Sequence, residues 1–148
     1  MNLQSYVEDF HRKFGHPVRT EPQTIDEGEA LLAFRMIEEE LMELDDALWK
    51  SDECICGETG CNTFSQSYYA PDLVEIADAL GDIVWLALGM ASRHGIDMNR
   101  VMTEIARSND SKLGLDGKPI YITEGPKAGK IGKGPNYTPP NLKAALGI

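Results

Sequence analysis

Two segments of the chain place carboxylates at helical spacing inside otherwise apolar sequence. The six acids in these segments are Glu39, Glu40, Glu43, Glu75, Asp78 and Asp82. Residues three and four apart lie on one face of a helix, so like charges at these spacings repel one another. A divalent cation between the two segments would relieve that repulsion, and ligands that are all oxygen favour Mg²⁺, or Mn²⁺, over zinc.

Glu40 is the acid that most needs a partner. On a helical wheel of roughly 3.6 residues per turn it falls among apolar side chains such as Met36 and Leu44. An ionised carboxylate facing a core costs on the order of 1–7 kcal/mol unless something pairs with it. The competing interpretation is a solvated face or ion pairs with arginines, which are Arg35, Arg93, Arg100 and Arg107. The apolar surroundings favour the metal, with Glu40, Glu43, Glu75, Asp78 and Asp82 as candidate ligands.

Hydrophobic periodicity predicts the helices that would carry these acids. We expect helices at residues 3–14, 27–50, 71–94 and 98–113, with Asp97 capping the last one. The third helix is the most apolar and should be the most buried. Strand-forming segments are almost absent, so the fold class is predicted to be all-α, an antiparallel bundle of about four helices.

Two segments interrupt this pattern within what we expect to be one domain, residues 1–148. Periodicity vanishes at residues 51–70, which are predicted to form an inserted loop. From residue 114 to 148 the chain is rich in Gly, Pro and Lys and is predicted to be an extended tail, with a short hairpin around the sequence IYIT.

Charge narrows the range of partners. Fourteen Lys and Arg against 24 Asp and Glu give a net charge of −10, which disfavours binding to a nucleic acid polymer. Residues 26–46 hold nine acids and one base, whereas residues 112–148 hold six lysines and two acids. An acidic centre with a basic tail suits a divalent metal and a polyphosphate. No apolar run is long enough to cross a bilayer and no signal sequence is recognisable, so we expect a cytoplasmic protein without membrane contact.

Three cysteines offer a second kind of site. Cys54, Cys56 and Cys61 lie within eight residues and could hold Zn²⁺ if His11, His16 or another chain supplied the fourth ligand. The protein would then be a zinc-stabilised interaction module. The spacing lacks a Cys-x-x-Cys pair, which makes this the weaker hypothesis.

Four sequence motifs together resemble the MazG-like, all-α NTP pyrophosphohydrolase superfamily. The runs EEELMEL and EIADALGDIVW resemble its two acidic motifs, EExxE and ExxD, and ARSNDSKLG and KGPNYTPPNL resemble its later segments. The resemblance covers roughly residues 28–142. The chain departs from many relatives at Ala79, where a Glu often stands, and in the insertion at 51–70, which leaves the substrate preference open.

The resemblance implies magnesium-dependent hydrolysis of (deoxy)nucleoside triphosphates to the monophosphate and pyrophosphate, for nucleotide-pool control. A carboxylate not engaged as a ligand, Glu39 or Glu40, could take the proton of the attacking water. It further implies that Asn109 and Lys112 hold phosphate or sugar oxygens, that Lys130 and Lys133 close over the triphosphate, and that the chain forms a homodimer or homotetramer.

Each of these assignments has a simpler alternative. Asn109 and Lys112 also suit an ordinary helix C-terminus, and the lysines of the tail could simply keep it soluble. Trp85 lies one turn beyond Asp82 and could stack on a nucleobase, although most such tryptophans belong to a core. A nucleotide sensor that keeps the acids but has lost turnover is the non-catalytic alternative.

Overall fold

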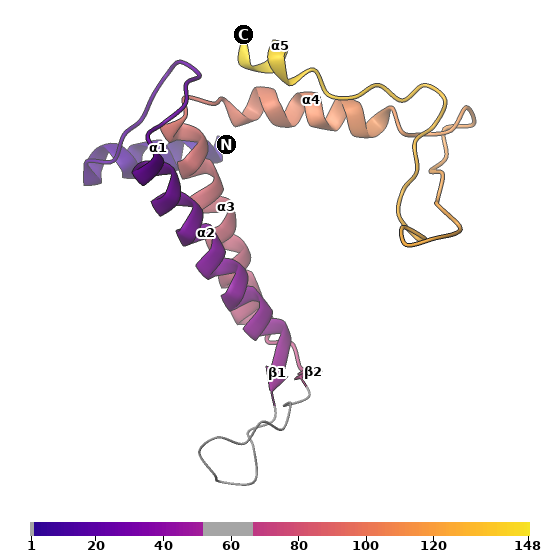
Figure 1. Cartoon of the computed structure of the whole chain (residues 1–148), viewed down its shortest axis with the longest axis horizontal. Helices are drawn as coiled ribbons and strands as arrows, with labels where there is room; N and C mark the ends of the chain where they lie inside the picture. Colours follow the sequence, from indigo (N-terminus) through magenta and orange to yellow (C-terminus); the bar gives the residue numbers. More distant parts are fainter. Residues whose placement is uncertain (1, 52–66) are drawn as a thin grey trace, which may run out of the picture.

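The computed structural model describes residues 2–51 and 67–148, which form an all-α fold (Figure 1). The elements are α1 (Leu3–Phe14), α2 (Glu27–Leu48), β1 (Trp49–Ser51), β2 (Ser67–Tyr69), α3 (Leu73–Arg93), α4 (Met98–Asp110) and α5 (Leu142–Leu146). The predicted fold class is therefore confirmed. No helix in these two ranges is long and apolar enough to cross a membrane. The cysteines of the zinc hypothesis, Cys54, Cys56 and Cys61, lie outside the described residues.

Side-chain caps set where the helices begin. Asp26, Asp72 and Asp97 accept hydrogen bonds from backbone N–H groups in the first turns of α2, α3 and α4, as an N-cap does. The second helix ends at Leu48 rather than residue 50, because Trp49 turns to extended backbone and begins β1. The fourth ends at Asp110 rather than residue 113. The short helix α5, capped by Asn141, was not predicted.

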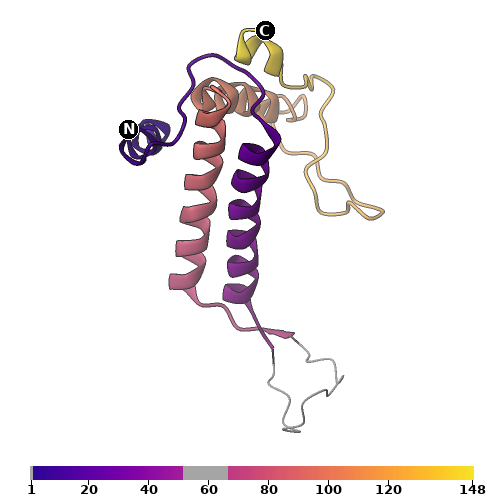
Figure 2. The same ribbon diagram turned by 60° about the vertical axis from the view of Figure 1, so that its left-hand side comes forward.

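Helices α2 and α3 run antiparallel and pack along their whole length (Figure 2). Small side chains line the seam between them: Ala33 and Ala47 on α2 and Ala79 on α3 are buried. At the far end β1 and β2 pair antiparallel, with Trp49 opposite Tyr69, and flank the predicted insertion. These two short strands were not foreseen.

Helix α1 packs across the C-terminal half of α3. Its contact side consists of Gln4, Val7 and His11, all buried. The imidazole of His11 lies against Gly89, where an added Cβ would come within 2.9 Å of Nε2. Glycine at this position therefore allows the two helices to approach closely. We call α1, α2 and α3 the hairpin unit.

Much of the apolar surface expected to be buried is exposed in one chain. Phe34 and Leu41, two of the apolar residues whose spacing predicts the second helix, are 54% and 53% exposed. On α3, Leu73 is 79% exposed, and burial is concentrated in residues 89–93. The prediction that this helix is the most buried element therefore holds only for its C-terminal end. The hairpin unit presents a large apolar surface to its surroundings.

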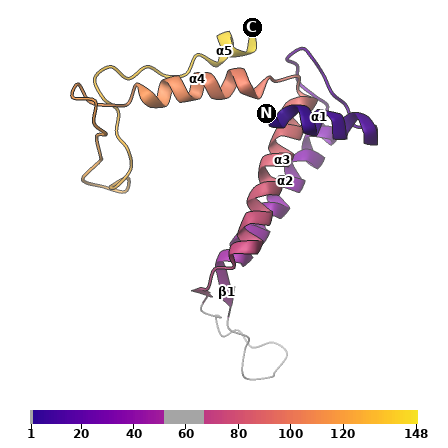
Figure 3. The same cartoon turned by 180° about the vertical axis from the view of Figure 1, so that it is seen from behind.

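The rest of the chain, residues 98–148, forms an arm that projects from the end of the hairpin unit (Figures 1 and 3). Its tail runs back along α4, and among the described elements α5 is the only one that α4 packs against extensively. The expected hairpin around IYIT exists as an antiparallel bridge between Tyr121 and Ile131. Within one chain, extended antiparallel helix packing is thus limited to α2 and α3.

One buried side chain fixes the corner between α3 and α4. The amide nitrogen of Gln4 donates to the Ser92 hydroxyl at 3.3 Å and to the Ile96 carbonyl at 2.8 Å, and its Oε1 accepts from the Met98 N–H at 2.9 Å. The direction in which α4 leaves the hairpin unit therefore depends on a residue of α1.

Candidate functional site

The acids of α2 and α3 form a cluster around Glu40. Burial raises the pKa of the Glu40 carboxyl, and the charges of Glu43, Asp82, Asp78 and Glu39 raise it further, in that order. Acids from two helices therefore act on one half-buried carboxylate across the seam between α2 and α3. We call Glu39, Glu40, Glu43, Asp78 and Asp82 the acidic cluster.

The acidic cluster has no arginine or lysine to neutralise it among the described residues. Arg93 pairs with Glu29 and Arg107 pairs with Glu104, so neither arginine contacts the cluster. Arg100 donates to the carbonyl of Ala144 on the arm. The alternative in which these acids form ion pairs with arginines is therefore wrong for residues 2–51 and 67–148. The other alternative, a solvated face, agrees with the structure at four of the five acids, because Glu39, Glu43, Asp78 and Asp82 are exposed.

The donor set of the cluster suits a hard divalent cation, because every donor is a carboxylate oxygen. In the two described ranges, however, no three Asp, Glu, His or Cys side chains converge closely enough to form a ready metal site. The acids are close enough for their charges to affect Glu40, but no three of them lie close enough to bind one ion. Glu75 is not among the charges that act on Glu40; it lies in the first turn of α3, where its N–H bonds to the Asp72 cap. Its role as a ligand stays a prediction, as do those of the other acids.

The arm brings two distant sequence motifs together. The ammonium of Lys112 donates to Oδ1 of Asn109 at 2.7 Å, and the Lys112 carbonyl accepts from the Gly134 N–H at 2.9 Å. A Cβ on Gly134 would collide with the carbonyl of Leu113. Only glycine fits here, so the segment after α4 and the KGPNY segment lie in direct backbone contact.

The two remaining lysines of the predicted site also lie on the arm. The ammonium of Lys133 sits 4.2 Å from the ring centre of Tyr137, a cation–π contact that holds it beside the same loop. Lys130 is exposed, and its carbonyl accepts from the N–H of Ile122 at 2.9 Å. Neither lysine contacts the hairpin unit directly.

The acidic cluster and the basic residues of the arm are not brought together within one chain. Asn109 lies near the far end of α4, which extends about 20 Å at 1.5 Å per residue. That end points away from the hairpin unit in all three views (Figures 1, 2 and 3). The structure thus contains two halves of a predicted site on separate parts of the chain.

A pocket of about 270 Å³ opens beside the acidic cluster, between α1, α2 and α3. Asp82 and Trp85 both line it, so the tryptophan does lie next to the cluster. Its ring is 37% exposed and meets Phe10 edge to face, with ring centres 5.6 Å apart. The sequence predicted no role for Phe10. It indicated only other roles for three polar residues of the pocket: His11 and His16 as zinc ligands, and Arg93 as an ion-pair partner.

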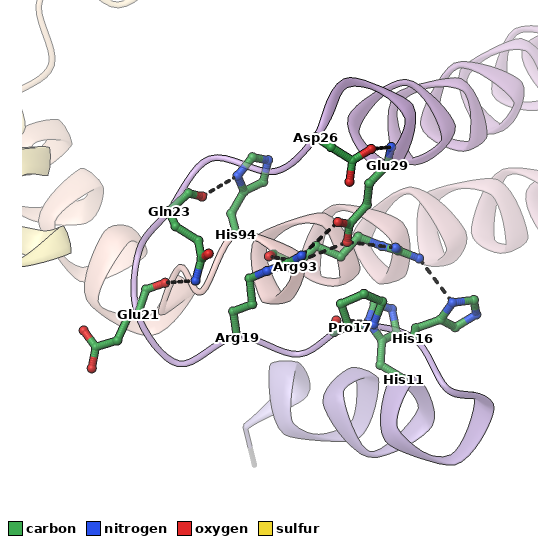
Figure 4. A network of polar contacts seen from close by, with 10 residues as sticks. All are labelled: His11, His16, Pro17, Arg19, Glu21, Gln23, Asp26, Glu29, Arg93 and His94. Atoms are coloured by element: carbon green, nitrogen blue, oxygen red, sulfur yellow. Dashed lines mark hydrogen bonds and ion pairs between the residues drawn. The ribbon is translucent and has the colours of Figure 1, made fainter.

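A charged network borders this pocket (Figure 4). Glu29 accepts from Arg19 at 3.0 Å and from Arg93 at 3.2 Å, and the hydrogen bond from Arg19 is the main cause of the lowered pKa of its carboxyl. Arg93 also approaches Nδ1 of His16 at 3.4 Å. The pKa of the neighbouring His11 imidazole is lowered, chiefly by burial. The network joins the loop after α1 to both helices of the pair.

The chain resembles known proteins in its sequence and in its fold. Residues 7–109 match the family model described as phosphoribosyl-ATP pyrophosphohydrolase. A crystal structure from Exiguobacterium sp. 255-15, of a candidate NTP pyrophosphohydrolase, aligns over 99% of this chain and 94% of its own. The identity is 22% and the TM-score 0.44. Curated proteins give no match.

Proposed function

The chain belongs to the phosphoribosyl-ATP pyrophosphohydrolase family, and from this premise we propose that it hydrolyses nucleoside triphosphates to the monophosphate and pyrophosphate with Mg²⁺. Its class as a hydrolase follows from the family, and the predicted membership of the all-α NTP pyrophosphohydrolase superfamily is confirmed. A MazG-like place within it, a cytoplasmic location and a role in nucleotide-pool control stay predictions. The observation that carries the proposal is the acidic cluster around half-buried Glu40, which has no basic partner within the part of the chain that the structure describes.

The cluster supplies the ligands and the base. Glu40, Glu43, Asp78 and Asp82 would hold Mg²⁺, with Glu75 as a further candidate. Bound Mg²⁺ would neutralise phosphate charge and lower the pKa of the attacking water. Glu39, exposed on α2, or Glu40 would accept the proton as the water oxygen bonds to the α-phosphorus. The bond from that phosphorus to the bridging oxygen breaks, and pyrophosphate leaves.

The arm would supply the positive charge that the cluster lacks. The ammonium of Lys112 donates one of its three hydrogens to Asn109, so two remain for phosphate oxygens. Asn109, with its Oδ1 engaged by Lys112, keeps its amide N–H₂ for a phosphate or sugar oxygen. Lys133 and Lys130 would approach the outer phosphates. The hairpin unit would thus bind the metal, and the arm would bind the phosphates.

A second copy of the chain would bring the two halves together. We infer a homodimer or homotetramer in which the arm of one copy reaches the acidic cluster of another. Two observations favour it: the halves lie apart within one chain, and the hairpin unit exposes large apolar side chains on both long helices. Burying such a surface is the main driving force for stable association.

Phosphoribosyl-ATP is a second candidate substrate, favoured by the family match over residues 7–109. It carries the same triphosphate, so the acidic cluster would act on it in the same way. The two candidates differ only in what lies beyond the α-phosphate.

The decisive test is pyrophosphate release from ribo- and deoxyribonucleoside triphosphates and from phosphoribosyl-ATP, with and without Mg²⁺. We expect Mg²⁺-dependent release of pyrophosphate and not orthophosphate, abolished by Glu43→Gln and by Asp82→Asn. Calorimetric binding of nucleotide without any turnover would instead support the sensor. Zinc retained after purification and lost on Cys56→Ser would support the interaction module.

Mixing two inactive variants tests the shared site. Glu43→Gln damages only the cluster and Lys112→Ala only the arm, so each should be inactive alone. If a site draws on two copies, mixed oligomers should regain activity, at most about a quarter of wild type for a dimer with random exchange. Activity that never returns, although light scattering shows that the copies mix, would place both halves of each site in one chain.

A further inference from the structure

The pocket between α1, α2 and α3 adjoins the acidic cluster but is no part of it. Asp82 belongs to both, and the other lining residues come from α1, the loop after it, and the inner faces of the helix pair. A triphosphate held at the cluster would therefore have this pocket within reach of its nucleoside end. The walls of the pocket decide what could enter it.

One side of the pocket is apolar. Trp85 and Phe10 meet edge to face at an interplanar angle of 78°, and Leu32 and Met36 of α2 complete the wall. Aromatic and thioether side chains make favourable contacts with planar rings, and stacking of a base on an aromatic ring contributes whatever the base. This wall would bind any nucleobase.

The other side carries hydrogen-bond donors. Arg93 is buried, and a guanidinium can only donate, so Nδ1 of His16 at 3.4 Å must be the acceptor. The proton of the neutral His16 ring is then on Nε2, which is free to donate. Arg93 lines the pocket beside His16, and its guanidinium also carries only donors. This end of the pocket therefore presents hydrogen-bond donors.

His11 takes the opposite tautomer. Its Nδ1 lies 3.4 Å from the carbonyl of Pro17, which can only accept, so this nitrogen carries the proton. Its Nε2 is turned against Gly89. His11 therefore holds the loop and the helix contact in place, and His16 is the histidine left to meet a ligand.

We propose that this pocket binds the base of the substrate and selects bases with a carbonyl oxygen at the edge that faces His16 and Arg93. Guanine, hypoxanthine, uracil and thymine present such an oxygen. Adenine and cytosine place an amino group at the corresponding position. Its N–H donors would face the donors of His16 and Arg93, so no hydrogen bond could form. The inference rests on the proposed function for its substrate class and concerns the same site. Of the two candidate substrates it favours nucleoside triphosphates over phosphoribosyl-ATP, which carries an adenine base.

Binding of monophosphates without metal tests the pocket separately from catalysis. The chain has two tryptophans, Trp49 and Trp85, so Trp49→Phe leaves Trp85 as the only tryptophan reporter. In this background we expect GMP to quench Trp85 at lower concentration than AMP, and UMP at lower concentration than CMP. Losing one neutral hydrogen bond corresponds to roughly 3- to 10-fold, so His16→Ala should reduce each preference by about that factor.

His94→Gln is the matched control. The Nδ1 of His94 faces the carbonyl of Gln23 at 2.9 Å, and the residue does not line the pocket. This variant should keep the preferences of the parent. Circular dichroism checks that His16→Ala, a change at an exposed residue, leaves the helices intact.

The outcomes separate this inference from the proposed function. Equal quenching by all four monophosphates, or preferences unchanged in His16→Ala, would overturn the selection. No quenching by any of them would overturn the pocket as the site for the base. Selective binding without pyrophosphate release from the triphosphates would support the base selection and contradict the proposed hydrolase activity. Hydrolysis with the same kcat/KM for all bases would support the hydrolase activity and contradict the base selection.

Discussion

The hairpin unit and the arm are held together by different forces. In the hairpin unit, helix packs on helix through small side chains, and Glu29 pairs with Arg93, which is buried, and with Arg19, which is partly exposed. The arm has almost no buried side chains. Its tail is fixed to α4 by hydrogen bonds from the side chains of Arg107, Ser108 and Ser111 to Thr138, and from the N–H of Asn141 to Glu104.

The charges differ in the same way. The hairpin unit carries the acidic cluster, whereas residues 98–148 hold eight Lys and Arg against four Asp and Glu. The part with the predicted ligands is therefore held by helix packing, and the part with the predicted phosphate contacts depends on polar contacts at the surface. Changes in the two parts should therefore affect different observables.

The largest effect should come from Glu40→Gln. We expect turnover to fall on the order of 10²–10⁴-fold, because the acid serves as ligand or base. The metal-free protein should melt at a higher temperature, since a repelled, half-buried charge has been removed. Steady-state kinetics and thermal unfolding in EDTA measure both. Glu38→Gln, an exposed neighbour outside the cluster, should change neither; a lower melting temperature for Glu40→Gln would contradict the repulsion.

Glu29→Gln tests what holds the hairpin unit. The change leaves Arg19 and Arg93 facing each other without their carboxylate. We expect a loss of about 2 kcal/mol in the free energy of unfolding, below the ~3–5 kcal/mol of a fully buried pair because Arg19 keeps contact with water. Urea unfolding measures it. Loss of activity at an unchanged free energy of unfolding would show that the network serves the site and not the fold.

Gly134→Ala should open the arm and leave the hairpin unit alone. The new methyl group would collide with the Leu113 carbonyl, and overpacking of this kind typically costs about 1–3 kcal/mol. Hydrogen exchange should accelerate at Gly134 and Thr138 but not along α2 and α3. Gly81→Ala is the control, because a Cβ there meets nothing within 4 Å and alanine favours the helix. Faster exchange throughout the chain would mean that the two parts unfold together.

Acid should loosen the arm through Glu104. Hydrogen bonds from Arg107, and then from the Asn141 N–H, lower the pKa of this carboxyl to about 2, from an ordinary value of 4.5. A depressed pKa contributes stability above pH 4.5, and that stability is lost as the pH falls toward 2. The amide resonance of Asn141 should report the change. In Glu104→Gln it should not titrate in this window; an unchanged titration there would assign the change to another group.

The sequence predicted the elements well, because their signals are local. Asp26, Asp72 and Asp97 each stand directly before a periodic segment, and each proved to be the cap. The spacing also placed Glu40 toward the seam, where the structure leaves it half-buried and not fully enclosed. The ends at Leu48 and Asp110 were missed by two or three residues, since nothing in the composition there stops a helix.

What the sequence could not predict depends on contacts between distant segments. The exposure of Phe34 and Leu41 follows from how few helices cover α2 in one chain, which periodicity does not reveal. His16 and Arg93 lie 77 positions apart and meet only because Gly89 lets α1 approach α3. The link between Gly134 and Leu113 is equally non-local, although the two motifs were recognised separately.

The corner held by Gln4 has a consequence for how the protein could be controlled. One amide sets the angle at which α4 departs, because it donates two hydrogen bonds and accepts a third. A rotation of even a few degrees at that corner is multiplied along the length of the arm, so the tip would shift by several times the displacement at its base. A displacement of α1 would therefore change the position of the lysines at the far end of the arm. A ligand that binds or displaces α1 would act on these lysines without contacting them.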